Sequence, residues 1–116
     1  MEESSYITIF ITVSTRAEAD NIAGVLLNER RVACTNIIPE VSSLFRWREK
    51  LDSAQECLLI AKTKASQLDE VVRLVKENHS YQVPETIAMP IVGGNRDYLE
   101  WIDNEVDNGP ESGEKI

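Results

Sequence analysis

The feature that most constrains this chain is a strictly alternating segment that runs straight into a helix start. In residues 6–14 isoleucine or valine alternates with threonine or an aromatic residue, and this period of two predicts a strand apolar enough to be central. Thr15 and Glu18 follow with capping-box spacing, in which each side chain satisfies an unpaired amide at a helix start. The predicted helix then repeats a buried stripe at helical spacing: Ala19, Ile22, Ala23 and Leu26.

A long hairpin follows this first strand-helix unit. Residues 32–38 predict a second strand, which Pro39 interrupts because proline has no N–H for a ladder, so an edge or a bulge is expected there. Strand character resumes at residues 42–47, residues 49–53 are expected to turn the chain, and residues 56–63 return as a third strand.

A second helix and a fourth strand complete the pattern. Ser66 and Asp69 again have capping-box spacing. After a loop at 79–85, residues 86–92 predict a short strand with Pro90 bending it, and Asn95 caps a short last helix. The expected buried positions of the two helices are Leu68, Val71, Val72 and Val75, and then Leu99, Ile102 and Val106.

The order strand-helix-strand-strand-helix-strand plus a helix predicts an α+β, ferredoxin-like domain with an antiparallel sheet and both main helices on one face. At 116 residues the chain fits one core, which we assign to residues 1–106. Residues 107–116 are polar and acidic, and we expect a disordered tail. This architecture hosts unrelated functions, so the fold alone assigns no role.

The net charge and the lack of targeting signals limit the partners and the cellular compartment that we expect for this chain. The net charge of −8 opposes nucleic-acid binding, which draws most of its non-specific affinity from cationic side chains. The N-terminus lacks a signal-peptide pattern and no apolar run approaches the roughly 20 residues of a spanning helix, so we expect no membrane partner and a cytoplasmic protein. Cys34 and Cys57 are then expected to be reduced thiols.

Three stretches of the sequence resemble the CutA family of divalent-cation tolerance proteins. They are residues 32–39 (VACTNIIP), 45–50 (FRWREK) and 78–85 (NHSYQVPE), and residues 97–102 are similar to the family's terminal helix. Two positions depart from the family pattern. Glu49 stands where a hairpin glycine is usual, and Ser80 replaces the proline after the histidine, which frees the backbone there.

The resemblance implies ferredoxin-like protomers in a PII-like homotrimer that is linked to copper and other divalent metals and is not an enzyme. The hairpin supports assembly independently, because Leu44, Phe45 and Trp47 would leave an apolar surface and an open edge on a monomer. We therefore expect subunits to pair through edge strands and the hairpin. The alternative is a PII-like regulatory trimer that binds a small ligand or a partner protein between its subunits.

Cys34 and His79 are the candidate metal ligands, since thiolate and imidazole together suit copper or zinc. The competing interpretations are a buried small hydrophobe for Cys34 and a helix-end cap for His79. One histidine and two cysteines do not supply the four ligands of a closed zinc site, so a site would be open or shared between subunits.

Trp47, Lys62 and Tyr81 are the candidate residues for a ligand pocket, and the two aromatic residues are expected to line it beside Cys34 and His79. Interface packing competes for the two aromatic residues, and a solvated lysine competes for Lys62. Two other functions of this fold lack their signatures. Residues 13–17 contain no glycine-rich phosphate loop of an acylphosphatase, and residues 57–62 contain none of the aromatic residues on which an RNA-recognition motif stacks bases.

Overall fold

The computed structural model describes residues 5–106, and its elements follow the predicted order. The strands are β1 (Tyr6–Val13), β2 (Cys34–Trp47), β3 (Lys50–Lys64) and β4 (Thr86–Pro90), and the helices are α1 (Arg16–Asn28), α2 (Leu68–Asn78) and α3 (Arg96–Glu105), with a 3-10 turn, η1 (Ala65–Gln67), before α2. The prediction of a disordered tail at 107–116 lies outside the described residues. No helix within residues 5–106 is long and apolar enough to cross a membrane.

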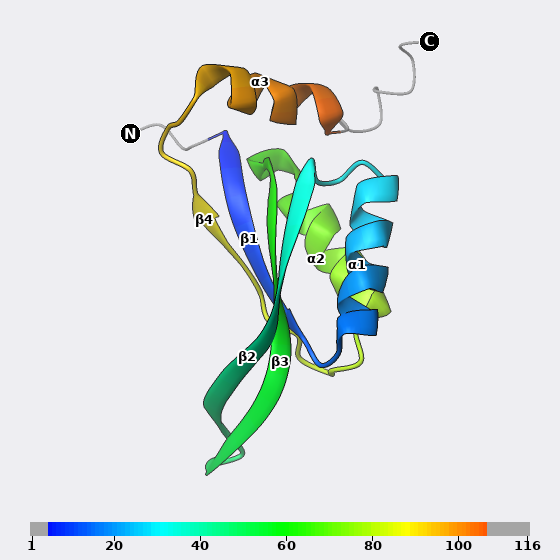
Figure 1. The fold of residues 1–116 in the computed structure, drawn as a ribbon, viewed down its shortest axis with the longest axis vertical. Coiled ribbons are helices and arrows are strands. Elements are labelled where there is room, and N and C mark those ends of the chain that lie inside the picture. Colours follow the sequence, from blue (N-terminus) through cyan, green and yellow to red (C-terminus); the bar gives the residue numbers. More distant parts are fainter. Residues whose placement is uncertain (1–4, 107–116) are drawn as a thin grey trace.

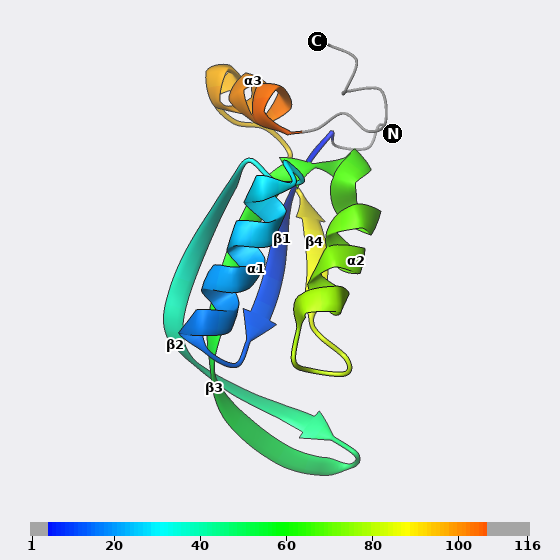
Figure 2. The same cartoon turned by 90° about the vertical axis from the view of Figure 1, so that its right-hand side faces the viewer.

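The four strands form one antiparallel sheet in the order β2-β3-β1-β4, so the strictly alternating β1 is central as predicted. Helices α1 and α2 cover one face of this sheet, and α3 lies across one of its ends (Figures 1 and 2). The isoleucines and valine of β1 face the two helices and are buried, together with the predicted stripe of α1. This α+β body places the loop after α2 beside the end of β1.

Strands β2 and β3 continue well past the body as a two-stranded ribbon. Their register shifts between Ile38 and Val41, and Glu40 adopts a positive φ of 64°, which confirms the irregularity predicted at Pro39. We call residues 41–56 the distal hairpin; Figure 1 shows it projecting from the body. No helix packs on this ribbon among the described residues.

The turn of the hairpin is tighter than predicted. Trp47 pairs directly with Lys50, and the two residues between them, Arg48 and Glu49, have φ values of 52° and 69°. Two positive φ values in a two-residue loop match the twist of the flanking strands, so pairing begins at Lys50 and the predicted turn at 49–53 is wrong.

The start of α2 also differs from the prediction. Ser66 lies in η1, α2 begins at Leu68, and its N-cap residue Gln67 makes no side-chain capping bond, so the box predicted from Ser66 and Asp69 does not form. The 3-10 turn rotates the helix start. The buried face of α2 also differs from the prediction: Val72 is 38% exposed, while a leucine that the predicted stripe omitted, Leu74, is buried.

The C-terminal elements follow the prediction more closely. Strand β4 ends at Pro90 rather than at residue 92, although the backbone N–H of Ile91 still donates to the carbonyl oxygen of Tyr6 over 3.0 Å. The Asn95 side chain accepts a hydrogen bond from the backbone N–H of Asp97 and so caps α3. Ile102 and Val106 are buried as expected.

Candidate functional site

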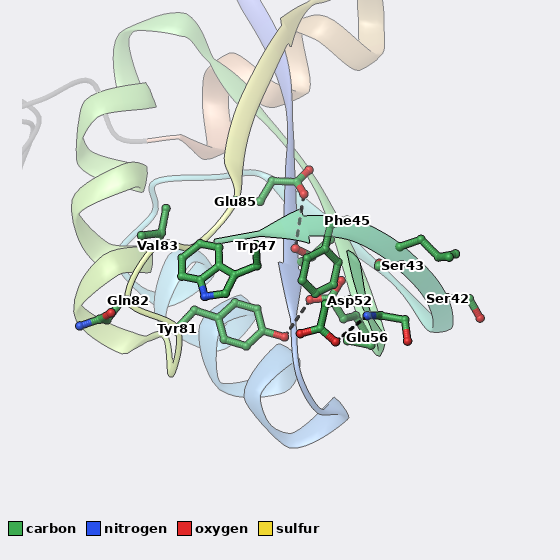
Figure 3. A pocket seen from close by; sticks show the side chains of 14 residues that line it. Ser42, Ser43, Phe45, Trp47, Asp52, Glu56, Tyr81, Gln82, Val83 and Glu85 are labelled. Atoms are coloured by element: carbon green, nitrogen blue, oxygen red, sulfur yellow. Dashed lines mark hydrogen bonds between the residues drawn. The ribbon is translucent and has the colours of Figure 1, made fainter. Parts of the chain in front are cut away.

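A cleft of about 750 Å³ lies between the distal hairpin and the loop at 79–85 (Figure 3). Trp47 reaches it from β2 and Tyr81 from the loop, so two of the three predicted pocket residues share one cavity. Its apolar and aromatic lining includes Leu44, Phe45, Trp47, Tyr81 and Val83, and its acidic lining consists of Asp52, Glu56 and Glu85. Of the described residues that line the cleft, none is basic.

Glu56 is the most buried of these carboxylates, with only 8% of its surface exposed. The hydroxyl of Tyr81 donates to its Oε2 over 2.8 Å. Burial, followed by this hydrogen bond and the negative charge of Glu56, raises the pKa of Tyr81 to about 12. The phenol therefore stays protonated at neutral pH and acts as a fixed donor that orients the carboxylate.

His79 holds the backbone of the same loop in place. Its side chain is fully buried, its Nε2 lies 2.7 Å from the carbonyl oxygen of Thr12, and its Nδ1 lies 3.0 Å from the backbone N of Tyr81. A carbonyl only accepts and an amide only donates, so these contacts assign a neutral ring protonated at Nε2. Both nitrogens are thereby occupied, and neither offers a lone pair in this arrangement.

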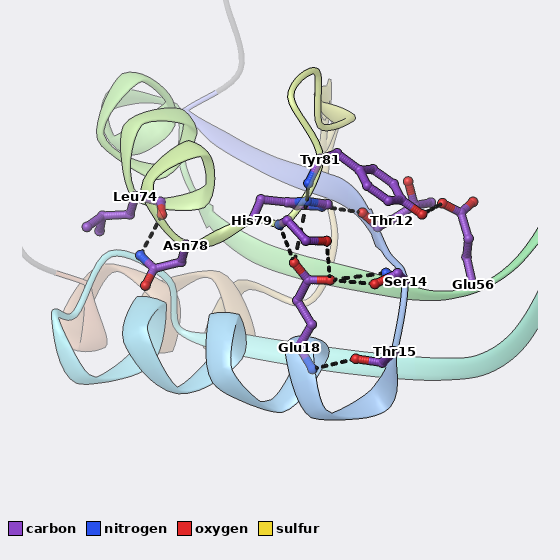
Figure 4. Close-up of polar contacts among 10 residues, drawn as sticks. Thr12, Ser14, Thr15, Glu18, Glu56, Leu74, Asn78, His79 and Tyr81 are labelled. Atoms are coloured by element: carbon purple, nitrogen blue, oxygen red, sulfur yellow. Dashed lines mark hydrogen bonds and ion pairs between the residues drawn. The ribbon is translucent and has the colours of Figure 1, made fainter. Parts of the chain in front are cut away.

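Glu18 anchors the loop to the start of α1 (Figure 4). Thr15 accepts from the backbone N–H of Glu18 over 3.1 Å, as the capping box predicts. The return bond is different from the prediction, because the Glu18 carboxylate accepts from the backbone N–H and hydroxyl of Ser14, at 3.3 and 2.9 Å, and not from Thr15.

The same carboxylate reaches across to the loop. Ser80 donates its backbone N–H to Oε2 of Glu18 over 2.6 Å and its hydroxyl to Oε1 over 3.1 Å. Burial alone would raise the pKa of Glu18, but the hydrogen bonds from Ser80 and Ser14 outweigh it and lower that pKa below its usual value. A proline at position 80 has no N–H, so this departure from the family pattern supplies two bonds that proline cannot make.

The structure does not bring the two predicted metal ligands together within one chain. Cys34 pairs with Lys62, which pairs with Thr8, whereas His79 contacts Thr12 at the other end of β1. Four residues of a strand span about 13 Å. Within residues 5–106 no group of three or more histidine, cysteine, aspartate or glutamate side chains is placed to hold a metal ion.

The remaining candidate residues lie away from the cleft. Cys34 neighbours Tyr98 of α3, and burial together with this neighbour raises the pKa of the Tyr98 hydroxyl. The Lys62 ammonium donates to the side-chain oxygen of Asn36, and Lys62 is not among the residues that line the cleft. Cys57 is buried in the core.

The sequence patterns did not predict the three acidic residues of the cleft, Asp52, Glu56 and Glu85, or the contact of Glu18 with Ser80. Glu56 gave one signal, a charged residue at the start of an otherwise apolar strand. The hydrogen bonds between Glu18 and Ser80 join residues that are 62 positions apart, so no local sequence pattern predicts them.

Comparison with known proteins gives consistent matches. The family described as CutA1 divalent ion tolerance protein matches residues 7–105. The chain is 44% identical to the chloroplastic protein CutA 1 of Oryza sativa over 98 residues, which cover 84% of this chain and 55% of that protein. It is 42% identical to the divalent-cation tolerance protein CutA of Thermus thermophilus, covering 81% of this chain and 91% of that protein.

The fold has solved counterparts as well. The crystal structure of CutA1 from Oryza sativa superposes with a TM-score of 0.89 at 40% identity, covering 92% of this chain and 98% of that one. The chain spans little more than half the length of the rice protein that it matches in sequence.

Proposed function

Because the chain belongs to the CutA1 divalent ion tolerance family, we propose that it acts in metal-ion tolerance as a PII-like homotrimer of ferredoxin-like protomers that binds copper or a similar divalent ion, without catalysis. The observation that carries this proposal is the family match over residues 7–105, which includes all three motif stretches and almost the whole described fold. The proposed compartment is the cytoplasm, where both cysteines would stay reduced.

Exposed apolar side chains at both sheet edges support the trimer. Leu44 and Leu51 of the distal hairpin are 81% and 74% exposed, and Ile87 and Met89 of the edge strand β4 are also exposed. An edge strand with apolar side chains and unpaired backbone groups is a template for pairing with another chain. Pairing between subunits would cover both features at once.

The metal part of the proposal needs more than one chain. In a single chain Cys34 and His79 do not fit one ion, since they lie at different levels of the sheet and both ring nitrogens of His79 are hydrogen-bonded. We keep both as candidate ligands of a site that neighbouring subunits or carboxylates complete. Ligation by Nδ1 of His79 would require the backbone N–H of Tyr81 to find another acceptor.

Metal titration of the reduced protein tests this. Zinc, and Cu(I) in a competing buffer, are titrated into the wild type, Cys34→Ser, His79→Gln and the core control Cys57→Ala, while light scattering measures the mass in solution. A trimer that saturates at one metal or fewer per chain, and loses binding in the first two variants only, supports the proposal. Weak binding that neither substitution changes contradicts the metal site, and a monomeric mass contradicts the trimer.

The cleft favours a second candidate function, a PII-like regulatory trimer whose ligand binds at the distal hairpin. Trp47 and Tyr81 line a cavity of about 750 Å³, within the range of about 300–1,000 Å³ that is usual for small-molecule sites. The expectation that this pocket lies beside Cys34 and His79 is wrong, because neither residue lines it, so ligand binding there and metal binding are separable by substitution.

A further inference from the structure

We infer that the cleft at the distal hairpin binds a small organic ammonium ion with an apolar or aromatic body, and that the Glu56 carboxylate is its principal partner. This inference rests on the ligand-binding candidate function above and names the chemical class of its ligand. Three observations carry it: a buried carboxylate whose hydrogen-bond donor is neutral, a lining without basic residues, and aromatic side chains in the same cleft.

The carboxylate is the first observation. Glu56 is more than nine-tenths buried, and its one hydrogen bond within residues 5–106 comes from a neutral donor, the Tyr81 hydroxyl, on Oε2. No described residue donates to Oε1, and Glu56 lines both this cleft and a second hollow beside Arg16 of α1. A buried carboxylate is costly unless it is paired, so this position favours a cation that carries N–H donors.

The charge of the lining is the second observation. Asp52 and Glu85 join Glu56 in the cleft, and neither forms an ion pair with a described residue. Asp52 accepts from the backbone N–H of Ser53 and Glu85 accepts from the Thr12 hydroxyl, both neutral donors. Such a lining repels anions. Within residues 5–106 these carboxylates are not grouped to hold a metal ion.

The aromatic lining is the third observation. Phe45, Trp47 and Tyr81 line the same cleft as Asp52 and Glu56, and the Tyr81 hydroxyl is hydrogen-bonded to Glu56 (Figure 3). Aromatic faces attract ammonium groups and also pack against an apolar body. The Trp47 ring already has one cation over it, because the Arg48 guanidinium at the hairpin tip lies 5.6 Å from its centroid. The cleft thus offers both a charge partner and an apolar wall.

The test compares three probes of similar shape on the full-length, chelator-treated protein. They are 2-phenylethylammonium, the neutral 2-phenylethanol and the anionic 3-phenylpropanoate, each followed by calorimetry and by amide NMR shifts. We expect the ammonium probe to bind at least about tenfold more tightly than the other two, with shifts confined to the distal hairpin and the loop at 79–85. This comparison uses only the wild-type protein, so it remains informative even if a substitution damages folding.

A matched pair of variants identifies the partner. Glu56→Gln keeps the shape and an acceptor for Tyr81 but removes the charge, and we expect it to weaken the ammonium probe about tenfold or more. Glu29→Gln removes one charge at the far end of α1 and should leave the affinity unchanged. Circular dichroism verifies that both variants are folded.

Three results would overturn the inference: the neutral probe binding as tightly as the ammonium probe, unchanged affinity in Glu56→Gln, or no binding of any probe. The last result is also what a basic side chain of a neighbouring subunit seated in the cleft would produce. Loss of metal binding or of the trimer, with ammonium binding intact, would instead count only against the proposed metal function.

Discussion

The α+β body and the distal hairpin share strands β2 and β3, yet the two regions bury their apolar residues differently. Strand β3 passes through both regions: Leu59 in the body is fully buried, whereas Leu51 near the hairpin tip is 74% exposed. In the body two helices cover the sheet, and in the hairpin no third layer exists among the described residues. An isolated two-stranded ribbon is marginal in water, so the hairpin depends on contacts that the body does not need.

Truncating the same residue type in the two regions gives the largest expected contrast. Leu59→Ala should lower the free energy of unfolding by about 2–5 kcal/mol, because it opens a cavity in a packed core. Leu51→Ala should change the stability of the monomeric chain by less than about 0.5 kcal/mol, since the side chain is already solvated. Denaturant unfolding at low protein concentration measures both.

Light scattering adds the second half of this contrast. If the exposed leucine serves assembly, Leu51→Ala lowers the mass at a given concentration while Leu59→Ala does so only by unfolding the chain. An equally large loss of stability for both variants, with no change in mass, would show that the distal hairpin packs against the α+β body of the same chain. That result would contradict the proposed difference between the two regions.

The loop at 79–85 is the bridge between the two regions, and Ser80 tests how firmly the body holds it. Ser80→Pro removes both hydrogen bonds to Glu18, and we expect a loss of about 1–3 kcal/mol in the free energy of unfolding. Ser80→Ala keeps the backbone N–H and should lose less. A proline variant as stable as the wild type would mean that its stiffer backbone offsets the lost bonds.

The dependence on pH identifies Glu18 as the acceptor. The pKa of Glu18 is lower in the folded chain than its usual value of 4.5, so its ionised form adds stability above that pH. This contribution is lost as the pH falls through the lowered pKa. The difference in unfolding free energy between the wild type and Glu18→Gln should therefore shrink in acid; a constant difference would contradict the assignment.

The body and the distal hairpin also differ in how far the sequence predicted them. Strict alternation in β1 and the stripe of α1 fixed the body's core, because burial there repeats with the period of the element. The tight turn at Arg48 and Glu49 was missed because neither residue is a usual choice for a positive φ. The 3-10 turn before α2 was missed because Ser66 and Asp69 match a capping box in sequence only.

For the site, the motif stretches identified several of the residues but only part of their grouping. Trp47 and Tyr81 were predicted together, but Glu56 and Glu18 owe their roles to contacts between distant segments. Cys34 and His79 were paired by chemistry, and only the strand register separates them along the sheet. Side-chain type predicts what a residue is able to bind, while topology decides with which neighbours.

Tyr81 tests the contact between the loop and the distal hairpin itself. Tyr81→Phe removes the donor to Glu56 and should cost about 1–2 kcal/mol of unfolding free energy at neutral pH. With a folded pKa of about 12 against 10.0 unfolded, the tyrosine contributes stability below pH 10 that is lost as the pH rises through 12. The pKa values of Tyr6 and Tyr98 are raised as well, so alkaline spectrophotometric titration should show one more late-ionising phenol in the wild type than in Tyr81→Phe. Equal titration curves would contradict the buried donor.

The smallest expected effect lies at the hairpin tip, and it has the opposite sign. Glu49 holds a φ of 69° between Trp47 and Lys50, a left-handed backbone that costs a residue with a Cβ about 1–2 kcal/mol and glycine almost nothing. Glycine also has more freedom to lose from the unfolded chain, so Glu49→Gly should gain only about 0.5–1 kcal/mol. The control Glu29→Gly, at a φ of −85°, has no strain to relieve and should lose stability. Denaturant unfolding measures both changes, and losses of equal size would show that the turn stores no strain. A gain at Glu49 alone would place the strain in the hairpin tip, which is the part of the chain that the body does not support.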